Sequence, residues 1–320
     1  MQIVKRVSAP TLIDDLPAAA CRTDACTAFP PLANLYLYAI LISGCRRLPA
    51  ASLRGSDASH TGGERMAIEP HLVIRGIVLR DTDTRDADKI LTLLTAEQGK
   101  IAVIARGARR RNCKFAACAQ PLAYSEWTLY KKGQWYYANE GTTIELFNGL
   151  RTELDAMALG FYLAELTETV ITEEAPQQEL LSLLLNGLYA ISTLHKPLPL
   201  VKAAFEIRLL CLAGYEPLAD ACAYCGRPEP EMPYFDVLQG VLHCAGCGGG
   251  EGRSLPLCRD SLAALRHIVY GDPKRLYSFA LGADALKRLS AAAEAFVSAQ
   301  LERGFRTLDF YKSVCCMARK

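Results

Sequence analysis

The stretch "HLVIRGIVLRDTDTRDADKILTLLTAEQGKIAVIARG", residues 71–107, holds three short aliphatic runs separated by segments rich in Asp, Thr and Gly. Such runs between turn residues are typical of β-strands. Two more follow, "YSEWTLYKKG" at 124–133 and "QWYYANEGTTIEL" at 134–146. Five closely spaced strands favour a small antiparallel barrel over alternating strands and helices, with residues 80–88 and 106–121 as its longer loops.

After Gly149 the apolar residues recur at helical spacing. The buried faces are expected to be formed by Leu154, Met157, Phe161 and Leu166; by Leu181, Leu184, Leu188 and Ile191; and by Val201, Phe205 and Leu212. Gly214 is a suitable left-handed residue to end the third helix. Further helices are expected from about residue 258 and from 283 to 303, the last ending at Gly304. The pattern predicts an α+β protein of more than one domain.

Residues 1–65 are rich in Pro, Ala, Ser and Arg and close with the linker-like "GSDASHTGGER". Two interpretations remain: a disordered extension or a wrongly assigned start before Met66, and a helical partner-binding element around residues 33–43. The first is favoured because no helix or strand period persists. The longest apolar run, "LYLYAILI" at 35–42, is far shorter than the roughly 20 residues of a membrane span, so a soluble, cytoplasmic protein is expected.

The net charge of +2 requires any nucleic-acid affinity to come from a local concentration of cations. Residues 100–114 supply one, with six cations and no acid: Lys100, Arg106, Arg109, Arg110, Arg111 and Lys114. Lys131 and Lys132 extend it, and Trp135 could present a ring. Cations with interspersed rings on a barrel suit single-stranded nucleic acid. The alternatives are a solvated loop that binds nothing, and a Trp135 ring that points into the barrel.

Cys222, Cys225, Cys244 and Cys247 form two Cys-x-x-Cys pairs separated by eighteen residues, a spacing that indicates a zinc site. Structural zinc has four protein ligands, whereas catalytic zinc keeps a position for water. We therefore expect one structural Zn²⁺ in a knuckle at about residues 218–253. His243 and Cys258 lie nearby but are not needed to complete the set.

Motifs for catalysis are missing from the sequence. It has no phosphate-binding Gly-x-x-x-x-Gly-Lys, no His-Glu-x-x-His and no Gly-x-Ser-x-Gly, and its five histidines are scattered. Acid pairs such as Asp86 and Asp88 are interpreted as solvated charge. No catalytic residue is assigned, and a protein that is not an enzyme is expected.

From about Met66 to Ser313 the chain resembles the RecO family of bacterial DNA repair and recombination mediators. The resemblance is carried by "GIVLRDTDTRDADKILTLLTAEQGKIAVIARGARR", "AAFEIRLLCLAGYEPLADACAYCG", "HCAGCG" and "AQLERGFRTLDFYKS". It implies an oligonucleotide-binding (OB) barrel over residues 66–148 and a helical domain over 149–320 that carries the zinc knuckle. The family's basic stretch corresponds to Arg106, Arg109, Arg110 and Arg111, and its zinc ligands to the four cysteines.

The resemblance also implies binding to single- and double-stranded DNA, annealing of complementary strands, and work with RecR in loading RecA, in the cytoplasm at the nucleoid. It further implies contact with the acidic C-terminal tail of the single-stranded-DNA-binding protein. That tail ends in an apolar residue, so its receptor should be a hydrophobic notch with a cation at the edge. Lys202 and Arg208 are the candidates, and both could equally be ordinary helix-surface charges.

Two departures from the family pattern stand out. Residues 1–65 have no counterpart, and Cys113 and Cys118 occupy the basic loop, which leaves oxidation sensitivity open. Two other functions are weighed against the mediator: a zinc-dependent nucleic-acid enzyme, and a protein-interaction adaptor that does not bind DNA.

Overall fold

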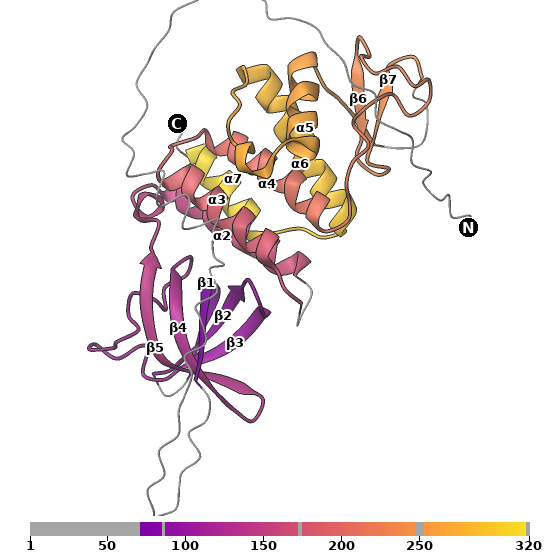
Figure 1. Ribbon diagram of the computed structural model, residues 1–320. Coiled ribbons are helices and arrows are strands. Elements are labelled where there is room, and N and C mark those ends of the chain that lie inside the picture. Colours follow the sequence, from indigo (N-terminus) through magenta and orange to yellow (C-terminus); the bar gives the residue numbers. More distant parts are fainter. Residues whose placement is uncertain (1–70, 85–86, 172–174, 248–252, 318–320) are drawn as a thin grey trace, which may run out of the picture. The chain divides into compact units, whose positions relative to one another are not determined.

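Five strands close into a barrel at the N-terminal side of a helical domain (Figure 1). The computed structural model describes residues 71–84, 87–171, 175–247 and 253–317; the expectations for residues 1–65 lie outside these ranges. The barrel strands are β1 (Leu72–Asp83), β2 (Lys89–Thr95), β3 (Gly99–Ala105), β4 (Tyr124–Lys132) and β5 (Trp135–Glu145). Their order around the barrel is β1-β2-β3-β5-β4, which confirms the predicted five-stranded barrel.

All neighbouring strands run antiparallel except β3 and β5, which pair in parallel. The expected loop at 80–88 is partly wrong, because β1 continues through Asp83 with an irregularity between Val78 and Arg80. An ion pair between Asp81 and Lys89 of β2 joins these polar residues across the two strands. Acidic residues at a strand end resemble a loop in sequence, which explains the error.

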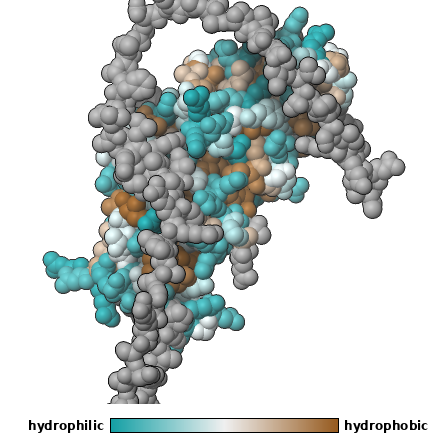
Figure 2. Space-filling model, viewed as in Figure 1, coloured by the Kyte–Doolittle hydropathy of each residue, from teal (hydrophilic) through white to brown (hydrophobic). Residues whose placement is uncertain are grey.

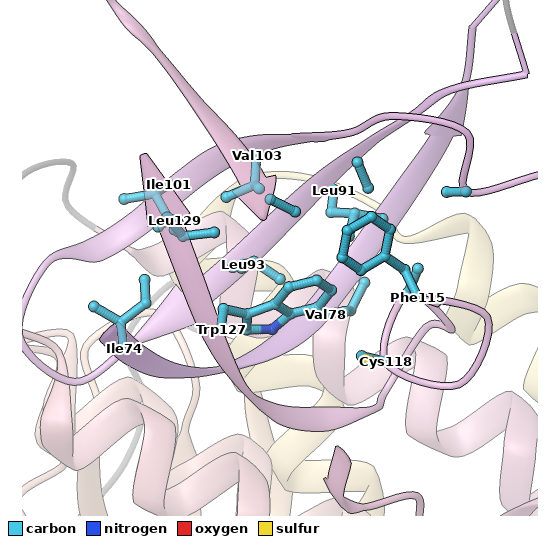
Figure 3. Packing of buried hydrophobic residues seen from close by; sticks show 14 residues of the cluster. Ile74, Val78, Leu91, Leu93, Ile101, Val103, Phe115, Cys118, Trp127 and Leu129 are labelled. Atoms are coloured by element: carbon cyan, nitrogen blue, oxygen red, sulfur yellow. The ribbon is translucent and has the colours of Figure 1, made fainter. Parts of the chain in front are cut away.

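The barrel core is made by alternate side chains of the strands (Figure 3). Leu91, Leu93 and Val103 are fully buried around the indole of Trp127, which has no exposed surface. Two residues of the segment after β3, Phe115 and Cys118, also belong to this core. The segment expected to be only a basic loop therefore closes one side of the barrel with its second half.

The helical domain begins with a 3-10 turn, η1 (Asn148–Arg151), whose Leu150 is buried. Its helices are α2 (Leu154–Val170), α3 (Gln178–Ser192), α4 (Leu198–Leu212), α5 (Arg259–Tyr270), α6 (Ala283–Leu301) and α7 (Arg306–Met317), with a 3-10 turn η2 (Pro273–Arg275). Gly214, which follows α4, adopts the expected left-handed conformation with a φ of 92°. No helix among the described residues is long and apolar enough to cross a membrane.

Two helical predictions were wrong, and one helix was missed. Leu154 of α2 is 63% exposed, whereas Leu159, Tyr162 and Leu163 are buried, because α2 is apolar around most of its circumference and its spacing does not single out one face. Helix α6 ends at Leu301 and is followed by a left-handed Glu302, not by Gly304 as the cap. Helix α7 was not predicted, since its few buried residues are interspersed with charges.

Candidate nucleic-acid interface and metal centre

The basic loop leaves β3 through a fixed turn. Gly107 has a φ of 67°, which glycine adopts without steric cost, and its N–H donates to Oδ1 of Asp88 at 2.6 Å. The N–H of Arg109 donates to the carbonyl of Ala87 at 3.0 Å. Asp88 therefore anchors the loop, and its interpretation as solvated charge was wrong; Asp86 lies outside the described residues.

Three consecutive arginines project from this turn, and they differ in whether they form an ion pair. Arg109 lies 3.4 Å from the carboxylate of Asp83 and donates to the carbonyl of Thr84 at 3.2 Å. Arg110 and Arg111 are exposed, and neither forms an ion pair within the part of the chain that the structure describes. Two guanidinium groups are thus available to an external anion, and Arg109 is partly neutralised.

The remaining predicted cations occupy different places. Lys100 precedes Arg106 by six residues, about 20 Å along a strand at its usual rise, so it does not belong to the loop cluster. Lys114 lies over the ring of Phe115, with its Nζ 5.3 Å from the centroid. Lys131 and Lys132 end β4, next to the hairpin turn at Gly133 that leads into β5.

Trp135 presents its ring outside the barrel, and the residue is 48% exposed, so the alternative that it points into the core was wrong. In the β4–β5 register Lys132 pairs with Trp135 and Tyr130 with Tyr137. The rings of Tyr130 and Tyr137 stack with centroids 5.3 Å apart, and the Cζ of Arg106 lies 4.6 Å from the centroid of Tyr137. The sequence did not indicate that Tyr130 and Tyr137 form such a pair.

The described surface seen in Figure 2 is largely hydrophilic, with hydrophobic patches between the charged groups. On the outside of the barrel, Trp135 pairs with Lys132, and the stacked Tyr130 and Tyr137 lie beside Arg106. The residues of the core cluster inside the barrel are apolar. The outer face of β3, β5 and β4 therefore offers both flat apolar surfaces and positive charge.

The four cysteines converge on one point in the knuckle. This segment contains β6 (Pro233–Asp236), β7 (Val241–Cys244) and β8 (Ser254–Pro256), in the sheet order β7-β6-β8. The Sγ atoms of Cys222, Cys225, Cys244 and Cys247 all lie within 4.8 Å of one another, and those of Cys225 and Cys244 are 3.7 Å apart. Sulfurs in tetrahedral zinc are about 3.8 Å apart for Zn–S bonds of about 2.3 Å, so the set fits a metal with four thiolate ligands.

Backbone hydrogen bonds shape the two ligand turns. The N–H of Gly226 donates to the carbonyl of Cys222 at 2.9 Å, and that of Cys247 to the carbonyl of Cys244 at 3.1 Å. His243 is directed elsewhere, because its ring stacks on Tyr234 and its Nε2 lies 2.8 Å from the Oγ of Ser254. Cys258 caps α5 through Ser261. Neither residue belongs to the thiol cluster.

Lys202 lies in the core of the helical domain, not at its surface. Only 3% of the residue is exposed, and its Nζ contacts Oε1 of Glu206 at 2.8 Å and Oε2 of Glu294 at 3.1 Å. Burial alone would lower the pKa of Lys202, but these two carboxylates raise it above its ordinary value. The expectation that Lys202 lies at the edge of an exposed notch was wrong.

Glu206 accepts a second bond from the hydroxyl of Tyr162 at 2.7 Å. Burial, with the nearby Glu206 carboxylate, raises the pKa of Tyr162 far above its ordinary value, so the hydroxyl stays a donor. Arg208, the other partner candidate, is half-buried and donates from its Nη1 atom to the carbonyl of Val269 at 3.0 Å. It remains a candidate.

A closed five-stranded barrel joined to a helical domain with a four-thiol cluster is the architecture that the family resemblance implies, and comparisons with known proteins show the same family. Residues 71–147 match the family described as Recombination protein O N terminal, and residues 151–309 match Recombination protein O C terminal. The chain belongs to the RecO family.

Curated relatives match about three quarters of the chain. The DNA repair protein RecO of Acetivibrio thermocellus is 33% identical over 245 residues, which are 76% of this chain and 97% of the relative. That of Anaeromyxobacter dehalogenans is 35% identical over 244 residues, or 75% of this chain and 96% of the relative. The similarity extends through both the barrel and the helical domain.

Proposed function

We propose that the protein is a recombination mediator that binds single- and double-stranded DNA through the basic loop of the barrel and anneals complementary strands. With RecR it would help to load RecA onto DNA covered by the single-stranded-DNA-binding protein, in the bacterial cytoplasm at the nucleoid. The observation that supports this proposal most directly is the loop itself: Arg110 and Arg111 are exposed, and they form no ion pair with any residue that the structure describes, on a turn fixed by Asp88 and Gly107.

The mechanism is electrostatic. Two DNA strands repel each other through their phosphates, and cations that contact both strands reduce that repulsion while releasing condensed counterions. Arg110 and Arg111 contribute their full charge, and Arg109 must exchange Asp83 for a phosphate to do so. The protein makes and breaks no bond in this scheme, so it is not an enzyme.

One Zn²⁺ held by the four cysteine thiolates is the proposed cofactor. Four thiolates leave no position for water, so the ion stabilises the knuckle and takes no part in chemistry. Arg208 remains the proposed cation for the acidic tail of the single-stranded-DNA-binding protein.

The test is replacement of Arg109, Arg110 and Arg111 together by Ala. Affinity for single-stranded DNA should fall, and the slope of log K against log salt should become shallower by up to about 2, because roughly 0.7 counterions are lost per phosphate contact. Fluorescence anisotropy at several salt concentrations measures both quantities.

The matched control removes three exposed cations of the helical domain, with Arg259, Arg275 and Lys287 replaced by Ala. Its net charge equals that of the loop variant, so a general charge effect would weaken both proteins alike. Unchanged affinity and slope in the loop variant would show that the loop is not the DNA site.

A further inference from the structure

Tyr130, Tyr137 and Arg106 form one continuous stack across three strands. The strand order β3-β5-β4 places Tyr137 of β5 between Tyr130 of β4 and Arg106, which directly follows β3. Tyr130 stacks on Tyr137 with an interplanar angle of 16°, and the guanidinium of Arg106 lies over the ring from the β3 side. Tyr137 therefore contacts a ring of one neighbouring strand and a guanidinium that follows the other.

The stack leaves a guanidinium as its outermost layer. Arg106 is exposed, and within the described residues it forms no ion pair. A guanidinium is planar, stacks on aromatic rings and keeps its edge donors for phosphate. Resting on Tyr137 reduces the rotamer freedom that Arg106 would lose on binding, so Tyr130 and Tyr137 act as positioning residues.

Trp135 supplies a second flat surface on the same side of the sheet. It precedes Tyr137 by two residues, so both side chains leave the same face of β5 about 7 Å apart. No other ring packs against Trp135 among the described residues, and nearly half of its surface is accessible. Ile104, which pairs with Tyr137 across β3 and β5, is half-buried.

We propose that Trp135 and the Arg106 guanidinium form a base-stacking subsite for two neighbouring unpaired bases, which adds to the affinity for single strands beyond the phosphate contacts of the loop. The proposal rests on the proposed DNA binding, and it assigns phosphates and bases to different residues. The loop arginines meet phosphates, which every nucleic acid carries, whereas only unpaired bases expose faces to Trp135 and Arg106.

The experiment compares oligothymidylate with an abasic deoxyribose-phosphate oligomer of equal length, which keeps the phosphates and lacks the bases. The wild-type protein should bind oligothymidylate more tightly. Trp135→Leu and Tyr137→Leu should each weaken oligothymidylate binding by roughly five- to a hundred-fold, the range of one base stacked on a side chain. Binding of the abasic oligomer and the salt slope of the Trp135→Leu protein should not change.

The chain carries its own optical reporter. It has two tryptophans, and Trp127 is fully buried while Trp135 is exposed. Oligothymidylate should quench the fluorescence of the exposed tryptophan, and the abasic oligomer should not. In Trp135→Leu the remaining emission comes from Trp127, and its blue-shifted maximum verifies that the barrel is folded.

Two further variants serve as controls. Tyr137→Phe keeps the ring and should bind as the wild type does. Ile144→Ala removes an apolar side chain of β5 that is 41% exposed and lies outside the stack, and it should also bind normally. Because Trp135 is exposed, its replacement tests the proposal even if Tyr137→Leu fails to fold.

The outcomes separate the subsite from the proposed function. The subsite alone would be overturned if the wild-type protein bound the two oligomers equally well while replacement of the loop arginines still weakened DNA binding. A wild-type protein that binds neither oligomer would overturn the proposed DNA binding and the subsite together. If Trp135→Leu lost affinity for both oligomers to the same extent, that result would also contradict base stacking.

Discussion

The buried lysine of α4 makes the sharpest stability prediction at the residue scale. Lys202 is the cation that neutralises Glu206, a residue with no exposed surface. Lys202→Ala should destabilise the helical domain by about 3–5 kcal/mol, the usual cost of leaving one member of a buried ion pair uncompensated. Thermal and urea unfolding followed by circular dichroism measure this loss.

Its control is a pair with the same helical spacing at the surface. Arg288 and Asp284 on α6 are both solvent-accessible, so Arg288→Ala should leave the free energy of unfolding nearly unchanged. A Lys202→Ala protein as stable as wild type that nevertheless lost partner binding would restore the surface role that the structure contradicts.

The role of a single residue was predictable where the chemistry of its residue type allows few roles. Four thiols at zinc spacing left little choice, and the structure brings Cys222, Cys225, Cys244 and Cys247 together. Lys202 and Asp88 were misjudged because a charge in sequence does not reveal its partner, which for Asp88 is a backbone N–H nineteen residues away. The spacing of Lys202 and Glu206 within an apolar helix was the overlooked signal.

At the scale of elements, the aliphatic runs predicted the positions of the barrel strands closely. They did not predict which side chains meet on the outer face of the barrel. The pairing of Tyr130 with Tyr137 depends on a register shift between Thr128 and Leu129 and on the parallel contact of β3 with β5. Both are long-range properties that no local pattern contains. Helix α7 was missed because its apolar residues show only a weak helical period. Its buried residues are Leu308, Tyr311 and Val314.

The knuckle should depend on its metal, because its small sheet has few buried apolar residues of its own. Phe235 instead packs against Phe296 of α6, with ring centroids 5.2 Å apart. We expect one zinc per chain by mass spectrometry under native conditions. Its removal by a chelator should increase hydrogen exchange in β6 and β7 while the barrel strands stay protected.

Cys244→Ser should reproduce the effect of the chelator, and DNA affinity should remain close to that of wild type. The matched control is Cys316→Ser, which removes an exposed thiol outside the cluster. Protection of β6 and β7 that persists without zinc would contradict a structural role for the metal.

At the scale of the whole molecule, the barrel and the helical domain are proposed to act on one substrate, DNA already covered by the single-stranded-DNA-binding protein. The barrel arginines would screen the two strands, while Arg208 of α4 would hold the acidic tail of the covering protein. The wild-type protein should therefore speed the annealing of covered complementary strands, measured by fluorescence energy transfer between end labels.

Two variants divide this activity between the domains. Replacing Arg109, Arg110 and Arg111 should slow annealing of both bare and covered strands, because phosphate screening is needed in each case. Arg208→Glu should slow only the covered strands, and covering protein without its acidic tail should abolish that difference. If Arg208→Glu slowed bare strands equally, Arg208 would belong to the DNA surface; acceleration accompanied by DNA cleavage would instead favour a zinc-dependent enzyme. An adaptor that does not bind DNA would anneal neither substrate, so this one assay distinguishes the mediator from both alternatives.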